Sequence, residues 1–396
     1  MFVMRRRVSE KKDGINLVVG AGLSGAVIAE RIANSLDEKV VIIDKKNHLG
    51  GLVSDYIDRN GFLLSRFGTH IFHTDDKQVW DYVNSFGEFR PYIQKLSACI
   101  NGIKSNVPFN LDSLYKIFPQ SIAERLEYKL LRVFPYDTEV YAEDLKIHCD
   151  NDFNFLAEYI YNNLSYPLSC KFWQDSRDDL QNSGLPHYFI RISRDNRVFK
   201  EKYQGVPVKG YSDLIENMLK NHNIELCLNT DYNYMVAKNF KKIFFTGSID
   251  DCFNYKFGML PYRSVSFEFS DIDINFYQSD GIMLYPFEFD FAAIHEYKHY
   301  QNLNVNKTVI SREYHTDFVY GENERACAIL TPCNIKLYEQ YLLYGKKYRN
   351  TFFLGRLGSY KNFTMAEAVK NALTLFDKVY NDETSDDFIN QIVNNC

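Results

Sequence analysis

The sequence of 396 residues lacks the apolar runs that membranes and secretion require. No segment approaches the run of about 18 apolar residues that spans a membrane, and the first twelve residues lack the apolar region that a secretory signal needs behind its positive charges. We therefore expect a cytoplasmic protein without a membrane span.

Metal-ligand spacing and excess positive charge are also missing. The eight cysteines include no CxxC pair, so they are expected to be free thiols, and no metal site is predicted. The net charge is -5, and the basic cluster Arg5 to Arg7 with Lys11 and Lys12 is short. Because nucleic-acid binding needs a basic surface, we expect no nucleic-acid partner.

The composition is that of a globular protein, with 45% apolar and 24% charged residues. A single core rarely grows beyond about 250 to 300 residues, so two or three domains are expected. No repeat or low-complexity linker separates them.

Short apolar runs predict buried strands, and a 3.6-residue period predicts helices. A strand, a helix and a second strand are predicted for residues 15–20, 26–36 and 39–44. Together they form a unit long enough for a parallel crossover. Two later runs, residues 241–247 and 350–356, resemble its strands. Helical spacing is found in residues 124–134 and 154–164, and strand-like alternation in residues 264–270 and 307–314.

We therefore predict an α/β protein, with a discontinuous Rossmann-like domain, a helical insert domain and an antiparallel β-sheet domain. The Rossmann-like domain is expected in residues 15–76, 204–250 and 350–378. The mostly helical domain is expected in residues 77–180, and the antiparallel sheet domain in residues 181–203 and 251–349.

The residues from Gly20 to Gly25 form a GxGxxG motif between the first strand and the first helix. In that context the glycines permit a tight turn and let backbone N-H groups approach a pyrophosphate at the helix N-terminus. Asp44 ends the second strand about twenty residues later, where a carboxylate can accept hydrogen bonds from a ribose. The motif predicts dinucleotide binding; the alternative is a glycine turn that serves packing alone.

A second glycine pair, Gly50-Gly51, favours FAD over NAD as the dinucleotide. Near the C-terminus, Gly355-Arg356 ends a strand, and Thr364 to Glu367 form a capping-box pattern that predicts a helix over residues 366–373. The N-H groups of that helix can point at the flavin. The alternative is that Thr364 and Glu367 simply cap a helix.

Six segments together resemble, in order, blocks of the UDP-galactopyranose mutase family, which are flavoenzymes. They are GAGLSGAVIAERIAN, DKKNHLGG, RFGTHIFHTDDKQVWDYVN, YQGVPVKGYSDLIE, KKIFFTGSIDDCFNYKFGMLPYRS and LGRLGSYKNFTMAEAV. The blocks span residues 15 to 375, and the similarity fades between residues 95 and 185.

The resemblance implies a mutase, an isomerase that interconverts the pyranose and furanose forms of a nucleotide-diphosphate hexose. In that family reduced FAD attacks the anomeric carbon through flavin N5 and expels the nucleoside diphosphate, and the sugar opens, recloses as a furanose and is recaptured. The furanose would enter a surface polysaccharide. A homodimer is expected because relatives often form one.

The resemblance also implies roles for individual residues. His70 and His73 lie in a loop expected against the reactive face of the flavin, although His70 can equally be a hydrogen-bonded core histidine. Arg191 is expected to hold the diphosphate and Tyr203 to touch substrate. Tyr166 and Trp173 are expected to sandwich the nucleotide base; the alternative for Trp173 is a core or lid residue.

The predicted site residues therefore form three sets. The catalytic set is His70, His73 and Arg191. The cofactor set is Gly20, Gly22, Leu23, Ser24, Gly25, Asp44, Lys45, Gly50, Gly51, His70, Gly355, Arg356, Thr364 and Met365. The substrate set is Tyr166, Trp173, Arg191, Tyr203 and Asn362.

The sequence departs from the family pattern around the substrate. Ala293 stands where a second diphosphate arginine is expected, Thr331 and Asn362 replace tyrosines, and Thr364 replaces an aspartate. Candidate cations that would compensate for Ala293 are Arg194, Arg197, Arg312 and Arg325. A lost charge-assisted phosphate contact costs about 1.5 to 3 kcal/mol.

Three functions fit these observations. The first is a mutase acting on UDP-galactose or a related donor such as dTDP-fucose. The second is an FAD-dependent oxidoreductase on the same scaffold, and the third is a non-catalytic FAD-binding relative. Oxygen consumption distinguishes the second from the first, and a flavin spectrum that responds to nucleotide sugars distinguishes the first from the third.

Overall fold

The computed structural model describes residues 14–173 and 189–381. Its first layer is a five-stranded parallel sheet in the order β13-β2-β1-β14-β20. The strands come from distant parts of the chain: β1 (Asn16–Val19), β2 (Val40–Ile43), β13 (Ile224–Cys227), β14 (Ile243–Phe245) and β20 (Thr351–Phe353). The discontinuous Rossmann-like sheet expected from the sequence is confirmed.

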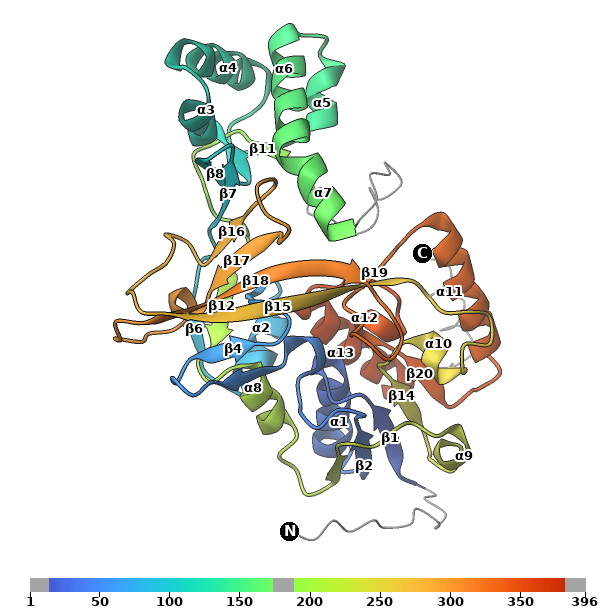
Figure 1. The fold of residues 1–396 in the computed structure, drawn as a ribbon. Coiled ribbons are helices and arrows are strands. Elements are labelled where there is room, and N and C mark those ends of the chain that lie inside the picture. Colours follow the sequence, from blue (N-terminus) through green and yellow to red (C-terminus); the bar gives the residue numbers. More distant parts are fainter. Residues whose placement is uncertain (1–13, 174–188, 382–396) are drawn as a thin grey trace.

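Helices cover both faces of this sheet. A large apolar cluster joins it to α1 (Leu23–Ser35), α2 (Lys77–Asn84), α8 (Tyr211–Met218) and α13 (Met365–Asn381), and Figure 1 shows α1 and α13 side by side. A second cluster joins the other face to α9 (Tyr234–Ala237) and α10 (Ile249–Cys252). The C-terminal part adds α11 (Pro332–Gly345) and α12 (Gly355–Gly358).

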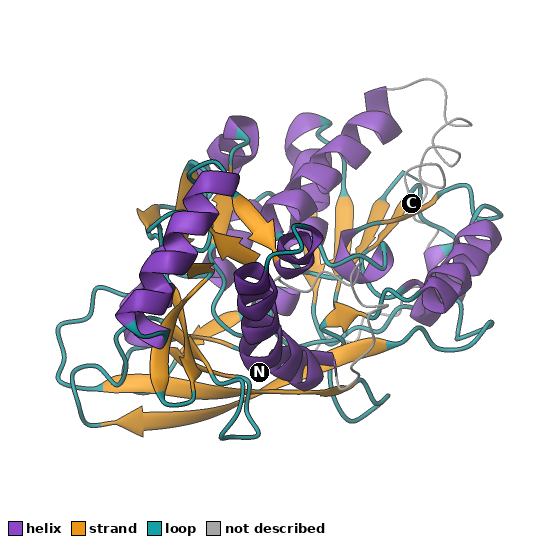
Figure 2. Ribbon diagram, turned by 90° about the horizontal axis from the view of Figure 1, so that it is seen from above, coloured by secondary structure: helices purple, strands orange, loops and turns teal. Residues whose placement is uncertain are grey.

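A larger mixed sheet lies beside the first, as Figures 1 and 2 show, with seven strands in the order β19-β15-β18-β17-β16-β7-β8. Its long strands are β15 (Tyr262–Ile272) and β18 (Thr308–Asp317). The others are β7 (Leu96–Ile100), β8 (Ile103–Val107), β16 (Ile282–Leu284), β17 (Ala293–Glu296) and β19 (Cys327–Ala328). All its pairs are antiparallel except β16 with β7.

The strands β7 and β8 lie in the segment expected to be mostly helical. They form a hairpin through Asn101 and Gly102, whose φ angles are both positive (51° and 78°). Asn-Gly is the strongest short signal for such a turn. The large sheet therefore extends into residues 77–180, a segment in which the sequence predicted mostly helices.

Two small β-elements connect the layers. The strands β5 (Phe72–Thr74), β12 (Tyr203–Pro207) and β6 (Phe89–Pro91) form an antiparallel sheet. The strands β3 (Asp55–Ile57) and β4 (Leu63–Ser65) form a hairpin after a 3-10 turn at Gly51–Val53, and a second 3-10 turn covers Tyr297–Tyr300.

The helical part projects from the large sheet, at the top of Figure 1. It has its own apolar core. Its helices are α3 (Leu111–Ile117), α4 (Gln120–Val133), α5 (Ala142–Ile147), α6 (Asn151–Ile160), a π-helical turn (Tyr161–Ser165) and α7 (Tyr166–Trp173). A three-stranded sheet of β9 (Phe109–Asn110), β10 (Glu139–Tyr141) and β11 (Phe189–Arg191) completes it. None of the helices in the described parts of the chain has the length and apolarity to cross a membrane.

Candidate functional site

The first glycine motif forms a tight turn between β1 and α1. Gly20 has φ 105°, and a Cβ on it would lie 2.0 Å from Oγ1 of Thr246. A Cβ on Gly25 would lie 2.0 Å from the carbonyl oxygen of Gly20. Glycine is therefore required at both positions, which brings the start of α1 close to the end of β1.

The N-terminus of α1 is open to an anion. Its N-cap, Gly22, has no side chain to accept a hydrogen bond from the first turn, and no acidic residue lies in that turn. Leu23 and Ser24 begin the helix and are buried, each 7% exposed. The first N-H groups of a helix have no intrahelical partner, so this end suits a phosphate.

The second glycine pair lies against the first. Gly22 and Gly50 form a parallel bridge, and the N-H of Gly50 donates to the carbonyl of Ala21 at 3.0 Å. A Cβ on Gly51, which has φ 54°, would lie 3.2 Å from Cα of Gly22. The two turns approach so closely because both lack side chains.

Asp44 joins this arrangement at the end of β2. Its Oδ2 accepts from the N-H of Ala21 and its Oδ1 from the N-H of Lys46, both at 2.8 Å. The neighbouring Lys45 is exposed. The carboxylate is therefore held beside the glycine turn, where the sequence analysis expected it to meet a ribose.

The C-terminal segment reaches the same place. Gly355 has φ 75°, and a Cβ on it would lie 3.2 Å from Oγ of Ser24. Arg356 donates from Nη2 to Sγ of Cys327 at 3.3 Å, while its Nε is buried and has no partner among the residues that the structure describes. Three glycine segments that are far apart in sequence thus converge on the N-terminus of α1.

The predicted capping box is present at α13. The N-H of Thr364 donates to Oε2 of Glu367 at 2.8 Å, and the N-H of Glu367 donates to Oγ1 of Thr364 at 3.2 Å. Met365 begins the helix, which ends at Asn381 rather than at residue 373. The helix is longer than predicted because its apolar face packs against α1.

His70 lies next to the second glycine pair. Its Nε2 donates to the carbonyl of Leu52 at 3.0 Å, and its own carbonyl accepts from the hydroxyl of Tyr211 at 3.0 Å. Burial lowers the pKa of His70 to about 4, and the nearby Arg356 contributes in the same direction. His70 is therefore a neutral imidazole near pH 7, with Nδ1 as an acceptor.

His73 lies in β5 and has different neighbours from His70. Its ring stacks on Phe199 with centroids 3.7 Å apart, and its Nδ1 lies 2.9 Å from Oε1 of Glu201. In the next strand Tyr203 stacks on Trp80 with centroids 5.6 Å apart. The structure thus groups His70 with the glycine segments, and His73 with Phe199 and Glu201.

Arg191 lies in β11, within the helical part. It is 1% exposed, its Nη2 pairs with Glu139 at 2.8 Å, and its Nη1 donates to the carbonyl of Arg197. Its guanidinium is therefore held by neighbours in that part, and the structure does not bring it into contact with His70.

The remaining substrate candidates lie in two places. Tyr166 and Trp173 begin and end α7; Tyr166 is 40% exposed, and the indole Nε1 of Trp173 is buried without a partner in the part of the chain that the structure describes. Asn362 lies elsewhere and clips two segments together, because its side chain accepts from the N-H of Ala328 at 2.9 Å and donates to its carbonyl at 3.0 Å.

The four arginines that might compensate for Ala293 are each near carboxylates. Arg194 pairs with Asp112 and Glu127, Arg197 with Asp195, and Arg325 with Asp250 and Asp251, while Arg312 lies 3.9 Å from Glu268. Arg312 is directly opposite Ile294 in the sheet and so faces away from Ala293. None of the four takes the position that the missing arginine would have had.

A cluster of ionisable side chains that was not predicted from the sequence lies on β17 and β18. Oε2 of Glu313 is 2.5 Å from Nε2 of His295, and its Oε1 is 2.6 Å from Nε2 of His315. Nδ1 of His295 lies 2.8 Å from Oγ1 of Thr69, next to His70. The strand alternation that places Glu313 and His315 on one face was the available signal.

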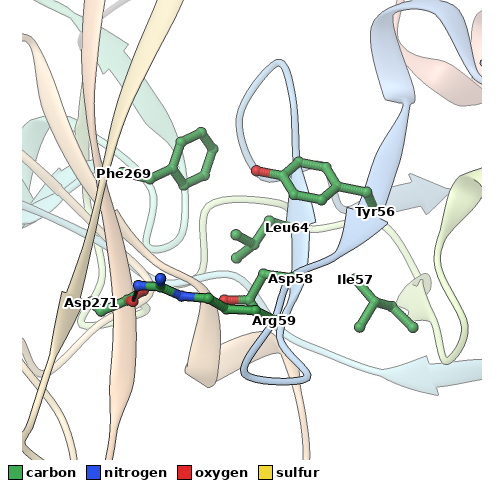
Figure 3. A pocket seen from close by; sticks show the side chains of 7 residues that line it. All are labelled: Tyr56, Ile57, Asp58, Arg59, Leu64, Phe269 and Asp271. Atoms are coloured by element: carbon green, nitrogen blue, oxygen red, sulfur yellow. Dashed lines mark hydrogen bonds and ion pairs between the residues drawn. The ribbon is translucent and has the colours of Figure 1, made fainter.

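One pocket lies away from these residues. It has a volume of about 690 Å³ and lies between the β3–β4 hairpin and β15, where Arg59 pairs with Asp271 at 2.7 Å (Figure 3). No predicted site residue lines it. A smaller cavity of about 50 Å³ is lined by His70, Thr69, Tyr211 and Tyr300, among others.

The fold and the convergent glycine turns define a dinucleotide-binding protein of the Rossmann class. The comparisons agree: a family of NAD(P)-binding Rossmann-like domains matches residues 18–86, and the UDP-galactopyranose mutase family matches residues 164–362. The chain belongs to the UDP-galactopyranose mutase family and is an enzyme of the isomerase class. Membership in this family, together with the dinucleotide-binding domain, implies a flavin cofactor.

Individual relatives support this assignment. The chain is 29% identical over 373 residues to a dTDP-fucopyranose mutase of Escherichia coli, covering 90% of this chain and 96% of the relative. It is also 29% identical over 381 residues to a probable UDP-galactopyranose mutase of Klebsiella pneumoniae, covering 93% and 96%. A crystal structure of reduced UDP-galactopyranose mutase shares the fold, with a TM-score of 0.71, 12% identity and coverage of 96% and 97%.

Proposed function

We propose that this protein is an FAD-dependent mutase that interconverts the pyranose and furanose forms of a nucleotide-diphosphate hexose, with reduced FAD as the active cofactor. The substrate is UDP-galactose or a related donor such as dTDP-fucopyranose, and the product serves the synthesis of a surface polysaccharide. Names of both substrate kinds occur among the relatives.

The observation that carries the proposal is the convergence of the glycine segments with Asp44 and His70. The uncapped end of α1 and the close approach of Gly22 to Gly51 suit a pyrophosphate, whose oxygens need N-H donors and no intervening side chain. The carboxylate of Asp44 is positioned for a ribose. The residues present therefore fit a bound dinucleotide.

The chemistry that reduced FAD supplies when bound is nucleophilic attack at the anomeric carbon without net oxidation of the sugar. The chain supplies orientation and charge. His70, neutral because of burial and with Nε2 committed to Leu52, offers Nδ1 as a hydrogen-bond acceptor beside the second glycine turn. Arg356, whose buried Nε has no partner among the described residues, supplies a permanent positive charge there.

The test is conversion of nucleotide sugars by the purified protein. Dithionite-reduced enzyme is incubated with UDP-galactose, UDP-N-acetylgalactosamine or dTDP-fucopyranose, and the furanose product is separated by chromatography. We expect one donor to be converted under reducing conditions only, with no oxygen consumed in turnover. The matched control is the same protein with oxidised flavin.

Two outcomes would contradict the proposal. Oxygen consumption with reduction of the flavin by a substrate would indicate an oxidoreductase. Bound and reducible flavin whose spectrum responds to no nucleotide sugar would indicate a flavin-binding protein without this activity.

A further inference from the structure

One face of the seven-stranded sheet carries ionisable side chains next to α7. Directly opposite residues in antiparallel strands share a face, so Ala293, Glu313 and Phe267 form one row. His315 lies two residues along β18 on the same face, opposite Val265. Helix α7 contacts β18 (Figure 1). Leu168 of α7 and Leu164 of the preceding π-helical turn pack with Ala293 in an apolar cluster.

Glu313 holds two histidines in place. Burial disfavours its ionisation, but hydrogen bonds from His295 and His315 more than offset this and keep the pKa of the carboxyl below its usual range. Both rings use Nε2 for this contact. Nδ1 of His295 contacts Thr69, whereas Nδ1 of His315 has no hydrogen bond to any described residue. His315 therefore has one nitrogen left for a ligand.

Arg263 lies beside His315 on the same face. It is 1% exposed; its Nη1 pairs with Asp317, and its Nε donates to the carbonyl of Phe172 at 2.8 Å. Its Nη2 is buried and makes no hydrogen bond within residues 14–173 and 189–381. The ring of the same Phe172 touches His315, with centroids 4.6 Å apart. Phe172 thus joins the two basic side chains.

An unpartnered buried donor is costly unless a ligand or water satisfies it. Here Nη2 of Arg263 and Nε1 of Trp173 are both buried without a partner among the described residues, and Trp173 follows Phe172 directly. Nδ1 of His315 is a third nitrogen in this group that makes no hydrogen bond to a described residue. Arginine and protonated histidine are the donors that phosphate oxygens favour.

We propose that His315 and Arg263 bind the diphosphate of the substrate, and that Glu313 and His295 position His315. This inference rests on the proposed function. It explains Ala293, which lies directly opposite Glu313 where a second diphosphate arginine was expected. Glu313 with two histidines carries a charge of +1 when both rings are protonated, the charge of that arginine.

Other charged and titratable groups lie near this cluster. Arg263 and Asp317 lie on the same face of the sheet, and His70 approaches from the loop before β5. Lys171 on α7 is turned to the carbonyls of Tyr285 and Phe291 instead.

The first test measures binding of UDP and dTDP to the flavin-loaded protein by calorimetry. For His315→Gln we expect the dissociation constant of the better-bound diphosphate to rise about ten- to a hundredfold, the loss typical of one charge-assisted hydrogen bond. Arg263→Lys should also weaken binding, because lysine lacks the planar fork of donors that matches phosphate oxygens.

The matched control is His299→Gln. His299 lies 3.2 Å from Glu296 in a different histidine–carboxylate pair, and Glu296 points to the other face of β17 from His295. We expect unchanged UDP and dTDP affinity there. Flavin content is measured for every variant, so that a folding defect is recognised.

A second measurement needs only wild-type protein. Diethyl pyrocarbonate modifies accessible imidazoles, and mass spectrometry locates the products. UDP or dTDP should protect His315 and leave His299 unprotected.

The outcomes separate the two proposals. If the wild type binds a diphosphate and converts a nucleotide sugar, but His315→Gln keeps the wild-type affinity for that diphosphate, this inference is wrong and the proposed function stands. Protection that is equal at His315 and His299 would also overturn it. If the wild type binds neither diphosphate and converts no donor, both proposals fail.

Discussion

At the scale of single residues, His70 links the protonation of one side chain to the stability of the fold. Burial lowers its pKa from 6.5 to about 4, so the folded protein binds this proton less readily than the unfolded chain does. Its contribution to stability is fully present above pH 6.5. This contribution is lost as the pH falls towards 4, which lowers the free energy of unfolding by up to about 3 kcal/mol.

We therefore expect His70→Gln to lose less stability than the wild type between pH 7 and pH 4. Urea unfolding of both proteins across this range measures the difference. Exposed His222 provides the control, because His222→Gln should follow the wild-type curve. Parallel curves for wild type and His70→Gln would mean that the imidazole is not buried as described.

Asp44 is a residue whose charge should matter for the cofactor. Asp44→Asn keeps the shape of the side chain but removes the negative charge beside the glycine turn. Since hydrogen bonds to a charged group contribute about 1.5 to 3 kcal/mol, FAD affinity should fall at least tenfold. Titration of apo-protein with FAD measures this, and unchanged affinity would exclude Asp44 from the cofactor site.

At the scale of elements, the capping box of α13 separates a structural from a cofactor role for Thr364. Thr364→Ala removes an N-cap and should lower the free energy of unfolding by about 0.5 to 2 kcal/mol. Thr364→Asp retains a capping oxygen and should be nearly neutral. If both variants lose FAD without losing stability, Thr364 acts on the flavin rather than on the helix.

Lys171 connects α7 to the loop before β17. Its Nζ donates to four carbonyls, among them Tyr285 at 2.5 Å, Phe289 at 2.6 Å and Phe291 at 3.0 Å. Lys171→Met leaves these carbonyls without their donor, so residues 285–291 should exchange amide hydrogens faster. Lys39→Met, at an exposed position, is the control. Unchanged exchange in the loop would contradict the tether.

At the scale of the whole molecule, FAD should stabilise the parts of the chain that converge on it. The parallel sheet takes strands from residues 16–43, 224–245 and 351–353, whereas the helical part has a separate core. A ligand at 100 times its dissociation constant adds about 2.7 kcal/mol of stability. Amide exchange with and without FAD should therefore slow in the sheet and change little in α3 to α6.

Equal protection of both parts would show that they unfold as one cooperative unit. If the amides of the helical part exchange first both with and without FAD, the result would agree with the separate core of that part. The comparison uses the complete chain in each case.

The sequence by itself determined the elements whose signals are local. GxGxxG between two apolar runs predicts β1, α1 and β2 because a turn of that geometry requires glycine, and Thr364 with Glu367 predicts the start of α13 because capping involves neighbouring residues. The family resemblance was equally readable, since it lies in contiguous blocks. The Asn101-Gly102 hairpin was also local, and was overlooked.

Only the tertiary structure decided which side chains meet across long stretches of chain. His295 lies 18 residues before Glu313 in the sequence, and His315 lies 2 residues after it. Only the pairing of β17 with β18 brings both histidines to the same carboxylate. In the same way Arg191 became paired with Glu139, and Gly355 came to lie against Ser24. Such contacts depend on strand register and packing between distant segments, which residue spacing alone does not specify.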